Sequence, residues 1–192
     1  MEEGMDSLFR EWEREHADSF RDEGVSNFQY ERTTSYFRSS RFDPVILKRM
    51  EEAKNIRSIS PTASLILNYS CIEFMLTKEL FTPIVYAFTA NNNIATYFAK
   101  HIVGFGMPPR HIGEIVDAFL AMTIQIDAEK VEIFGETKNL WKYLEAKKNI
   151  RNIAVHRTLD TTEKESKEME QLALFILNKI CKPLRAELMN WQ

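Results

Sequence analysis

The C-terminal segment 163–190 carries the pattern that most restricts the fold of this chain. Its apolar side chains recur at steps of three and four residues, at Met169, Leu172, Ile176, Ile180 and Leu184. This spacing places them along one side of a long helix. The 192 residues include only six glycines and six prolines, which argues against strands joined by tight turns. We therefore predict an all-α fold of long helices joined by short loops.

Two other helix starts are marked by a capping side chain followed by proline. Asp43-Pro44 opens one helix, and Ser60-Pro61 opens another. Proline suits the first helical position because its missing N–H would have no partner there, and the residue before it can cap the helix. These two dipeptides therefore predict helices from about residues 44 and 61 onward.

The remaining segments are less sharply marked. Apolar spacing predicts further helices over residues 6–23, 93–102, 111–126 and 137–155. Residues 25–41 hold aromatics and arginines without a clear period, and we expect them to be partly irregular. Pro83 is expected to kink or restart its helix and Pro183 to bend the C-terminal one. Asp160 or a threonine after it is expected to cap that last helix.

Charge and cysteine content indicate what the chain can bind and in which cellular compartment it is expected. The net charge of -3 gives no general attraction to nucleic acid, so RNA or DNA binding would need a local basic patch. Cys71 and Cys181 lie among apolar residues without a CxxC pair, and we expect both to be reduced core residues. The acidic N-terminus lacks the hydrophobic core of a secretion signal. These features predict a cytoplasmic protein.

One uncharged segment has the length of a membrane span. Residues 80–99 carry no charged side chain, and a stretch of this length could cross a bilayer. The segment also contains Pro83 and three consecutive asparagines, which are costly in hydrocarbon. We therefore expect a buried helix pair with an asparagine-rich break, and no membrane partner.

The strongest functional signal is a basic segment near the C-terminus. Four permanently charged side chains lie within eleven residues, with a histidine beside them and no acid: Lys147, Lys148, Arg151, His156 and Arg157. Such a patch can hold phosphates even on an acidic protein. Arginine grips a phosphate and stabilises charge that develops on it, and histidine transfers protons near neutral pH. Together they suffice for metal-independent RNA cleavage through the ribose 2′-OH.

The spacing of Arg151 and His156 limits how they can act together. Five residues on a straight helix turn through about 500°, or about 140° net, so the two side chains do not share a face. Arg151 continues the stripe of Leu140 and Leu144, whereas His156 lies where the helix is expected to end. Either the last turn unwinds, or a second copy of the chain completes the site in a symmetric dimer.

The segment Arg151-Asn152-Ile153-Ala154-Val155-His156 resembles the R-x4-6-H motif of the HEPN superfamily (higher eukaryotes and prokaryotes nucleotide-binding domains). Asn152 matches the polar residue that commonly follows the arginine, and Glu73 interrupts an earlier apolar helix as in that family. The resemblance covers residues 60–188. It implies an HEPN-like bundle of four to five core helices, which we place at residues 59–192, with an N-terminal helical extension at residues 1–58.

Many HEPN proteins are metal-independent endoribonucleases of toxin–antitoxin, phage-defence or RNA-processing systems, and they typically dimerise to form the cleft. Carried onto this chain, the resemblance implies that His156 is the acid and base and that Arg151 is the phosphate and transition-state ligand. Asn152 would orient the site or contact RNA. The resemblance further implies a homodimer that acts on RNA, with no cofactor and no metal, and an antitoxin or other regulatory protein as a partner.

The same residues also allow structural interpretations. Lys147, Lys148 and Arg157 are expected to form a general electrostatic surface for RNA rather than to act as catalysts. Arg151 and His156 could instead complement the dipole at the end of a helix. Glu73 could pair with Arg151 and orient it, or it could lie exposed on the polar flank of its helix.

Three functions therefore stand beside one another: an endoribonuclease, which the residues favour, a non-catalytic HEPN-like module that binds a nucleotide or a protein, and a structural subunit. The structural subunit predicts that Arg151 pairs with a same-chain carboxylate and faces no cleft. No metal site is expected at His16, His101 or His111, because no ligand spacing accompanies them. The motifs of NTPases, dinucleotide enzymes, zincins and serine hydrolases do not occur in the sequence.

Overall fold

The computed structural model describes residues 30–39, 42, 44–88, 110–156 and 160–190. The elements in chain order are α2 (Tyr30–Ser39), α3 (Pro44–Ile56), α4 (Pro61–Met75), η1 (Leu76–Phe81), α5 (Thr82–Phe88), α7 (Arg110–Ile124), β1 (Val131–Ile133), β2 (Glu136–Lys138), α8 (Leu140–His156), α9 (Glu163–Phe175), η2 (Ile176–Cys181) and α10 (Lys182–Asn190). Apart from one two-stranded hairpin, the described residues confirm the all-α prediction. The helices predicted at 6–23 and 93–102 lie outside them.

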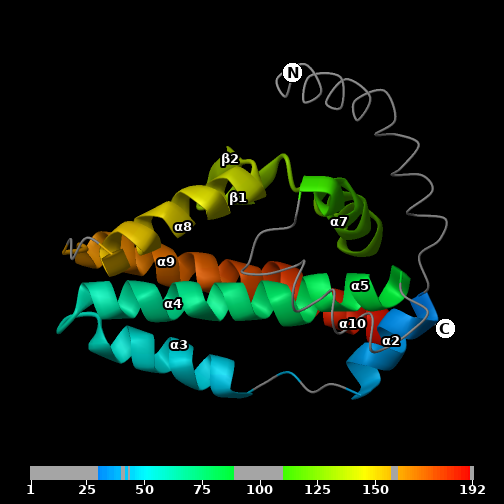
Figure 1. The fold of residues 1–192 in the computed structure, drawn as a ribbon, viewed down its shortest axis with the longest axis horizontal. Coiled ribbons are helices and arrows are strands. Elements are labelled where there is room, and N and C mark those ends of the chain that lie inside the picture. The colour runs from blue at the N-terminus through cyan, green and yellow to red at the C-terminus, as the bar shows by residue number, and fades with distance from the viewer. Residues whose placement is uncertain (1–29, 40–41, 43, 89–109, 157–159, 191–192) are drawn as a thin grey trace, which may run out of the picture.

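Two helical hairpins form the body of the fold (Figure 1). One consists of α3 and α4, and the other of α8 and α9. The central helices α4 and α9 run side by side in the same direction. Near their N-terminal ends Ser166 Oγ lies 2.8 Å from Ser64 Oγ. Each central helix continues without a gap, as α4–η1–α5 and as α9–η2–α10, and we call these two continuous helices the central rods. Farther along them Arg185 of α10 contacts Glu79 of η1. The helices α3 and α8 both pack on α4 and flank this central pair.

The N-terminal ends of the two central helices follow the predicted capping chemistry. Ser60 Oγ accepts a hydrogen bond from the backbone N–H of Ala63, with Pro61 at the first helical position of α4. Thr162 caps α9, and its side chain and that of Glu165 satisfy each other's backbone N–H groups. The threonine alternative for this cap is therefore confirmed.

Both central rods change to a wider π-helix directly before a proline. At the end of η1 the N–H of Thr82 donates to the carbonyl of Thr77, five residues back, and the same step occurs at the end of η2. A proline donates no backbone hydrogen bond and its ring clashes with the carbonyl four residues earlier, and a wider turn relieves that clash. The disturbances expected at Pro83 and Pro183 are therefore changes of helix type, after which each rod continues.

Within the segment 25–41, expected to be partly irregular, residues 30–39 form the helix α2, and the other residues of the segment lie outside the described ones. Thr33, Thr34 and Phe37 are buried on one side of this helix. Thr34 Oγ1 donates to the carbonyl of Leu188 at 2.9 Å. Contacts with distant parts of the chain therefore stabilise a helix whose own sequence shows no clear period.

The helix predicted at 137–155 begins at Leu140, because Thr137 belongs to β2. Phe134 (φ 57°) and Gly135 (φ 78°) form the two-residue turn between β1 and β2. Positive φ at both positions gives the turn that matches the twist of paired strands. Ile133 is fully buried, so the hairpin contributes to the core. The sequence interpretation missed this element because each strand has only three residues.

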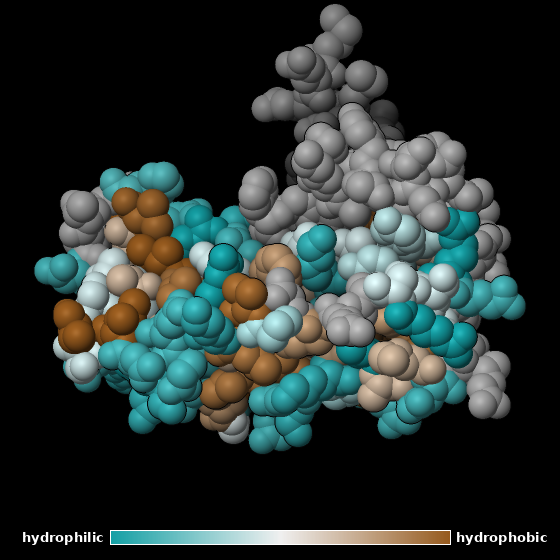
Figure 2. All heavy atoms as spheres, turned by 90° about the horizontal axis from the view of Figure 1, so that it is seen from below, coloured by the Kyte–Doolittle hydropathy of each residue, from teal (hydrophilic) through white to brown (hydrophobic). Residues whose placement is uncertain are grey.

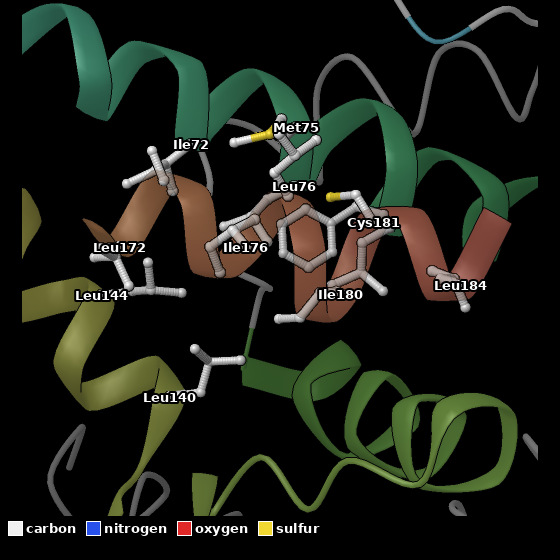
Figure 3. Close-up of a cluster of buried hydrophobic side chains, with 14 of the residues drawn as sticks. Ile72, Met75, Leu76, Leu140, Leu144, Leu172, Ile176, Ile180, Cys181 and Leu184 are labelled. Carbon is white, nitrogen blue, oxygen red and sulfur yellow. The ribbon is translucent and has the colours of Figure 1, made fainter. Parts of the chain in front are cut away.

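The hydrophobic core lies between the central rods. Figure 3 shows Ile72, Met75 and Leu76 facing side chains of α9 and η2, with Leu140 and Leu144 of α8 beside them. The five apolar positions that define the C-terminal pattern are all fully buried: Met169, Leu172, Ile176, Ile180 and Leu184. This part of the prediction is confirmed.

The two cysteines lie in the core, as expected. Both Cys71 and Cys181 are buried and free. Burial raises the pKa of the Cys71 thiol to about 11 and also raises the pKa of the Cys181 thiol. Thiolate formation is disfavoured at both positions, so neither cysteine has the character of a nucleophile.

The segment predicted as an N-terminal extension shares this core. Phe37 of α2 and Ile46 and Met50 of α3 belong to the same buried cluster as the residues of α4 and α9. The helix α2 packs on α5 and α10. The predicted boundary between residues 58 and 59 falls in the turn between α3 and α4, and the division into extension and domain stays a prediction.

The surface carries apolar groups in more than one place. Figure 2 shows the underside of the molecule as a mosaic of hydrophilic and hydrophobic atoms. Val45, Leu47 and Ile59 are among the exposed apolar side chains of the described residues. Apolar atoms make up more than half of an ordinary protein surface, so such exposure does not mark a site by itself. None of the described helices combines the length and the apolar character that a membrane span requires.

Candidate functional site

The helix α8 carries the motif segment and begins at a clear cap. Asn139 accepts two backbone hydrogen bonds, from Lys142 N–H on its side-chain oxygen and from Tyr143 N–H on its carbonyl, each at 3.0 Å. From there α8 continues as a regular α-helix to His156. The alternative in which the last turn unwinds to bring His156 toward Arg151 is therefore wrong.

Arg151 lies against α4, where two side chains one turn apart hold its guanidinium. Its Nη2 donates to Oε1 of Glu73 at 2.5 Å. Its Cζ lies 5.0 Å from the centre of the Tyr69 ring, within the range of a cation–π contact. The side chains of Arg151 and Glu73 keep 21% and 17% of their surface exposed. Of the two alternatives for Glu73, paired with Arg151 or exposed on its helix, the structure shows the pair. The role of Glu73 as an orienting acid stays a prediction.

Burial controls the electrostatics of this contact. It raises the pKa of Glu73, and the charges of Arg151 and Lys148 oppose that rise. Burial also raises the pKa of Tyr69, with a further increase from the Glu73 charge. The Tyr69 side chain therefore stays a neutral phenol at physiological pH, and its ring presents an unchanged face to the guanidinium.

The pairing of Arg151 is incomplete. Of its three nitrogens, only Nη2 makes a hydrogen bond to a described residue. Nε is buried and has no partner in the described part of the chain, and no described residue bonds to Nη1. A buried donor without an acceptor is costly. Arg151 is therefore held in place by a carboxylate and a ring while part of its donor capacity stays unused.

A second, partly buried arginine shows what complete pairing looks like in the same molecule. Arg185 of α10 donates from Nε and Nη2 to the two oxygens of Glu79, at 3.0 and 3.2 Å. Its Nη1 donates to the carbonyl of Phe37 at 3.3 Å, and its Cζ lies 4.9 Å from the Phe37 ring centre. The sequence interpretation missed this contact, because Glu79 stands beside Lys78 just before the uncharged stretch that begins at Leu80, and nothing in that pattern marks it as a buried acid.

Lys147, predicted as part of an exposed basic surface, lies inside the fold. The residue is 8% exposed. Its Nζ donates to Oε2 of Glu168 at 2.9 Å and lies 5.2 Å from the centre of the Tyr143 ring. The expected exposed position is therefore wrong for Lys147, because the long side chain reaches back to an acid on α9.

The other predicted RNA-binding residues differ in position. Lys148 is partly exposed on α8, close enough to Glu73 to oppose the rise in the pKa of that carboxyl. Arg157 lies outside the described residues. A role in RNA binding stays a prediction for both.

Asn152 and His156 lie toward the C-terminal end of α8, where Asn152 is partly exposed and His156 is exposed. No contact joins His156 to Arg151 within the described ranges, as the helical spacing predicts. Ile153 and Val155 are exposed beside them. In a single chain the motif therefore has an exposed imidazole, that of His156, and apart from it the guanidinium of Arg151, which contacts Glu73 and Tyr69.

The chemistry available here is that of proton transfer and phosphate binding. His156 can exchange a proton with a substrate, and Arg151 can donate to a phosphate oxygen from Nη1. Among the described residues no group of three or more His, Cys, Asp or Glu side chains could hold a metal ion. The three other histidine side chains of the sequence lie outside the described ones.

Comparison with protein-family models, with curated proteins and with solved structures gave no match for this chain.

Proposed function

We propose that this chain is an HEPN-like endoribonuclease that cleaves RNA through the ribose 2′-OH without a metal ion and acts as a homodimer. The observation that carries the proposal is the incomplete pairing of Arg151. Glu73 and Tyr69 hold its guanidinium, while Nη1 has no partner in the described part of the chain. A phosphate oxygen can accept from that nitrogen. His156 lies five residues farther along the same helix.

In the proposed reaction a histidine removes the proton from the 2′-OH, and the 2′-oxygen attacks the neighbouring phosphorus. The bond to the 5′-oxygen breaks, and a protonated histidine gives its proton to that oxygen. The products are a 2′,3′-cyclic phosphate and a free 5′-OH. Arg151 stabilises the negative charge of the phosphorane, and Asn152 orients the site or contacts RNA. DNA is not cut because it lacks the nucleophile.

A second copy supplies what one helix lacks. His156 and Arg151 are about 140° apart around a regular helix, so one chain does not direct both at the same phosphate. A two-fold dimer places two Arg151–His156 sets in one cleft. The exposed side chains of Ile153 and Val155 suit such a contact, since the centres of interfaces are depleted in charged groups.

The biological setting follows from the resemblance. An RNA-cleaving activity of this kind fits a toxin or a phage-defence effector, restrained by an antitoxin or other regulatory protein. Lys148 and Arg157 are the proposed contacts to the RNA backbone, whose affinity would fall with rising salt. Lys147 is not among the proposed RNA contacts, because it is buried and its ammonium group already forms an ion pair with Glu168.

The test is an RNA cleavage assay in EDTA with wild-type protein, Arg151→Ala and His156→Ala. We expect wild-type cleavage to leave 2′,3′-cyclic phosphate ends, and each variant to be slower by about 100-fold or more. Lys179→Ala, which removes an exposed lysine of η2, is the control and should cleave at the wild-type rate. Absence of cleavage by the wild type, or full activity of His156→Ala, rejects the proposal.

The second candidate is a non-catalytic HEPN-like module that binds a nucleotide or a protein. The ion pair of Arg151 with Glu73 is the same-chain pairing that the structural subunit predicts, and it also fits this candidate, because a carboxylate already neutralises the arginine. The exposed Ile153 and Val155 favour a protein partner in particular. This candidate predicts that His156→Ala keeps biological function, whereas Ile153→Asp abolishes it.

A further inference from the structure

Tyr69 lies against Arg151, the residue proposed to bind a phosphate oxygen. It is on α4, one turn before Glu73, and is 1% exposed. Its ring centre is 5.0 Å from Cζ of Arg151. No described residue makes a hydrogen bond to its hydroxyl group, so the contact that Tyr69 offers to Arg151 is the face of its ring. Tyr69 and Glu73 thus approach the same guanidinium from the same helix.

The ring supplies an orientation that the carboxylate leaves open. Glu73 is joined to Arg151 by one hydrogen bond, from Nη2. A single bond of this kind lets a guanidinium turn about the contact, whereas two parallel bonds fix its plane. Arg185 has such a pair of bonds, to both oxygens of Glu79. A cation–π contact with an aromatic face can also restrict how a guanidinium turns, and Tyr69 makes such a contact with Arg151 at 5.0 Å.

We propose that Tyr69 is a positioning residue for Arg151: its ring fixes the plane of the guanidinium, so that Nη1 is held ready for a phosphate oxygen. The inference rests on the proposed function for the role of Nη1, but the fixing of the guanidinium does not depend on catalysis. A group fixed before the substrate arrives costs no reorganisation in the transition state. Tyr69 therefore acts through Arg151 and does not itself touch the RNA.

The test compares Tyr69→Leu and Tyr69→Phe with Phe37→Leu. Phe37 is the matched control, because it is also 1% exposed and also lies under an arginine, at 4.9 Å. In the cleavage assay we expect Tyr69→Leu to lower kcat about tenfold and to leave KM within about twofold. Tyr69→Phe keeps the ring and should keep the wild-type kcat. Phe37→Leu should lower the thermal midpoint without lowering kcat.

A second measurement needs no activity. The Nε–H resonance of Arg151, assigned through Arg151→Lys, reports by ¹⁵N relaxation whether the guanidinium is ordered. Tyr69→Leu should increase its motion, whereas Tyr69→Phe and Phe37→Leu should not. If Tyr69→Leu does not fold, Tyr69→Met takes its place, because its longer, flexible side chain adapts to an irregular space and carries no ring.

The outcomes separate this inference from the proposed function. A wild-type protein that cuts no RNA rejects the function, and the relaxation measurement still decides whether Tyr69 fixes Arg151. Unchanged order of Arg151 in the variant without a ring overturns the inference. An equal loss of kcat in Tyr69→Leu and Phe37→Leu also overturns it, since the effect would then be general loss of packing.

Discussion

Two arginines of this protein are held in almost the same way and differ in one respect. Each guanidinium lies about 5 Å from the centre of an aromatic ring, Tyr69 for Arg151 and Phe37 for Arg185. Each pairs with a glutamate on the rod formed by α4 and η1. Arg185 uses all three of its nitrogens, whereas hydrogen bonds to described residues use only one nitrogen of Arg151.

This difference separates a structural arginine from a candidate ligand-binding one. Complete pairing satisfies a buried charge and leaves it nothing to offer a substrate. Incomplete pairing is less favourable for folding, and it preserves a donor for a phosphate. The Arg185 contact joins α2, η1 and α10, so we assign it to stability. We propose that the Arg151 contact has a function.

The largest expected effect is on stability at the Arg185 contact. Arg185→Met leaves Glu79, which is 4% exposed, buried without its counter-charge. We expect a loss of about 3 kcal/mol or more in the free energy of unfolding. Arg151→Met should cost about 1 kcal/mol, because Glu73 can be solvated more easily. Urea unfolding of both variants measures the difference, and equal losses would remove the distinction between the two arginines.

The next effect concerns the two tyrosines near these contacts. Tyr36 donates from its hydroxyl to the carbonyl of Lys78 at 3.0 Å, an acceptor that lies five residues before Pro83. Tyr36→Phe should therefore cost about 1 kcal/mol. Tyr69→Phe should change the free energy of unfolding by less than about 0.5 kcal/mol, because no described residue bonds to that hydroxyl. Comparable losses in chemical denaturation would contradict the assignment of these two hydroxyl groups.

The smallest effect is a pH dependence at Glu73. Burial raises its pKa, so the folded chain binds this proton more tightly than the unfolded chain. Its contribution to stability is full below the unfolded pKa of about 4.3 and is lost as the pH rises through the folded pKa. Relative to Glu73→Gln, wild-type stability should fall as the pH rises from about 4 to about 7.

Urea unfolding of both proteins over this pH range isolates the titration of one group, because the other carboxylates are common to both. A difference that moves in favour of the wild type as the pH rises would show that the Arg151 charge outweighs burial. The pair would then resemble an ordinary stabilising ion pair, and the comparison with Arg185 would weaken.

Local chemistry explains what the sequence predicts well. The starts of α3 and α4 follow from Pro44 and Pro61, whose effect on the backbone is confined to neighbouring residues. The core face of α9 and α10 follows from a spacing that matches the helical period. Such features need no knowledge of distant contacts, and the structure confirms them.

The π-helical segment that both central rods carry before a proline was not predicted, and the sequence shows no repeat. In the structure each central rod has a π-helical segment before a proline, and these segments lie 100 positions apart in the chain. The core positions hold different apolar side chains, such as Tyr69 and Met169.

For the candidate site, the sequence by itself determined the helix that carries Arg151 and His156, and the angle between them, because both follow from helical geometry. It left open whether Glu73 meets Arg151 and gave no sign that Lys147 is buried or that Arg185 pairs with Glu79. These contacts join residues 21 to 106 positions apart. Only the tertiary structure decided them, because the packing of α8, α9 and α10 on the α4–η1 rod determines which charges meet.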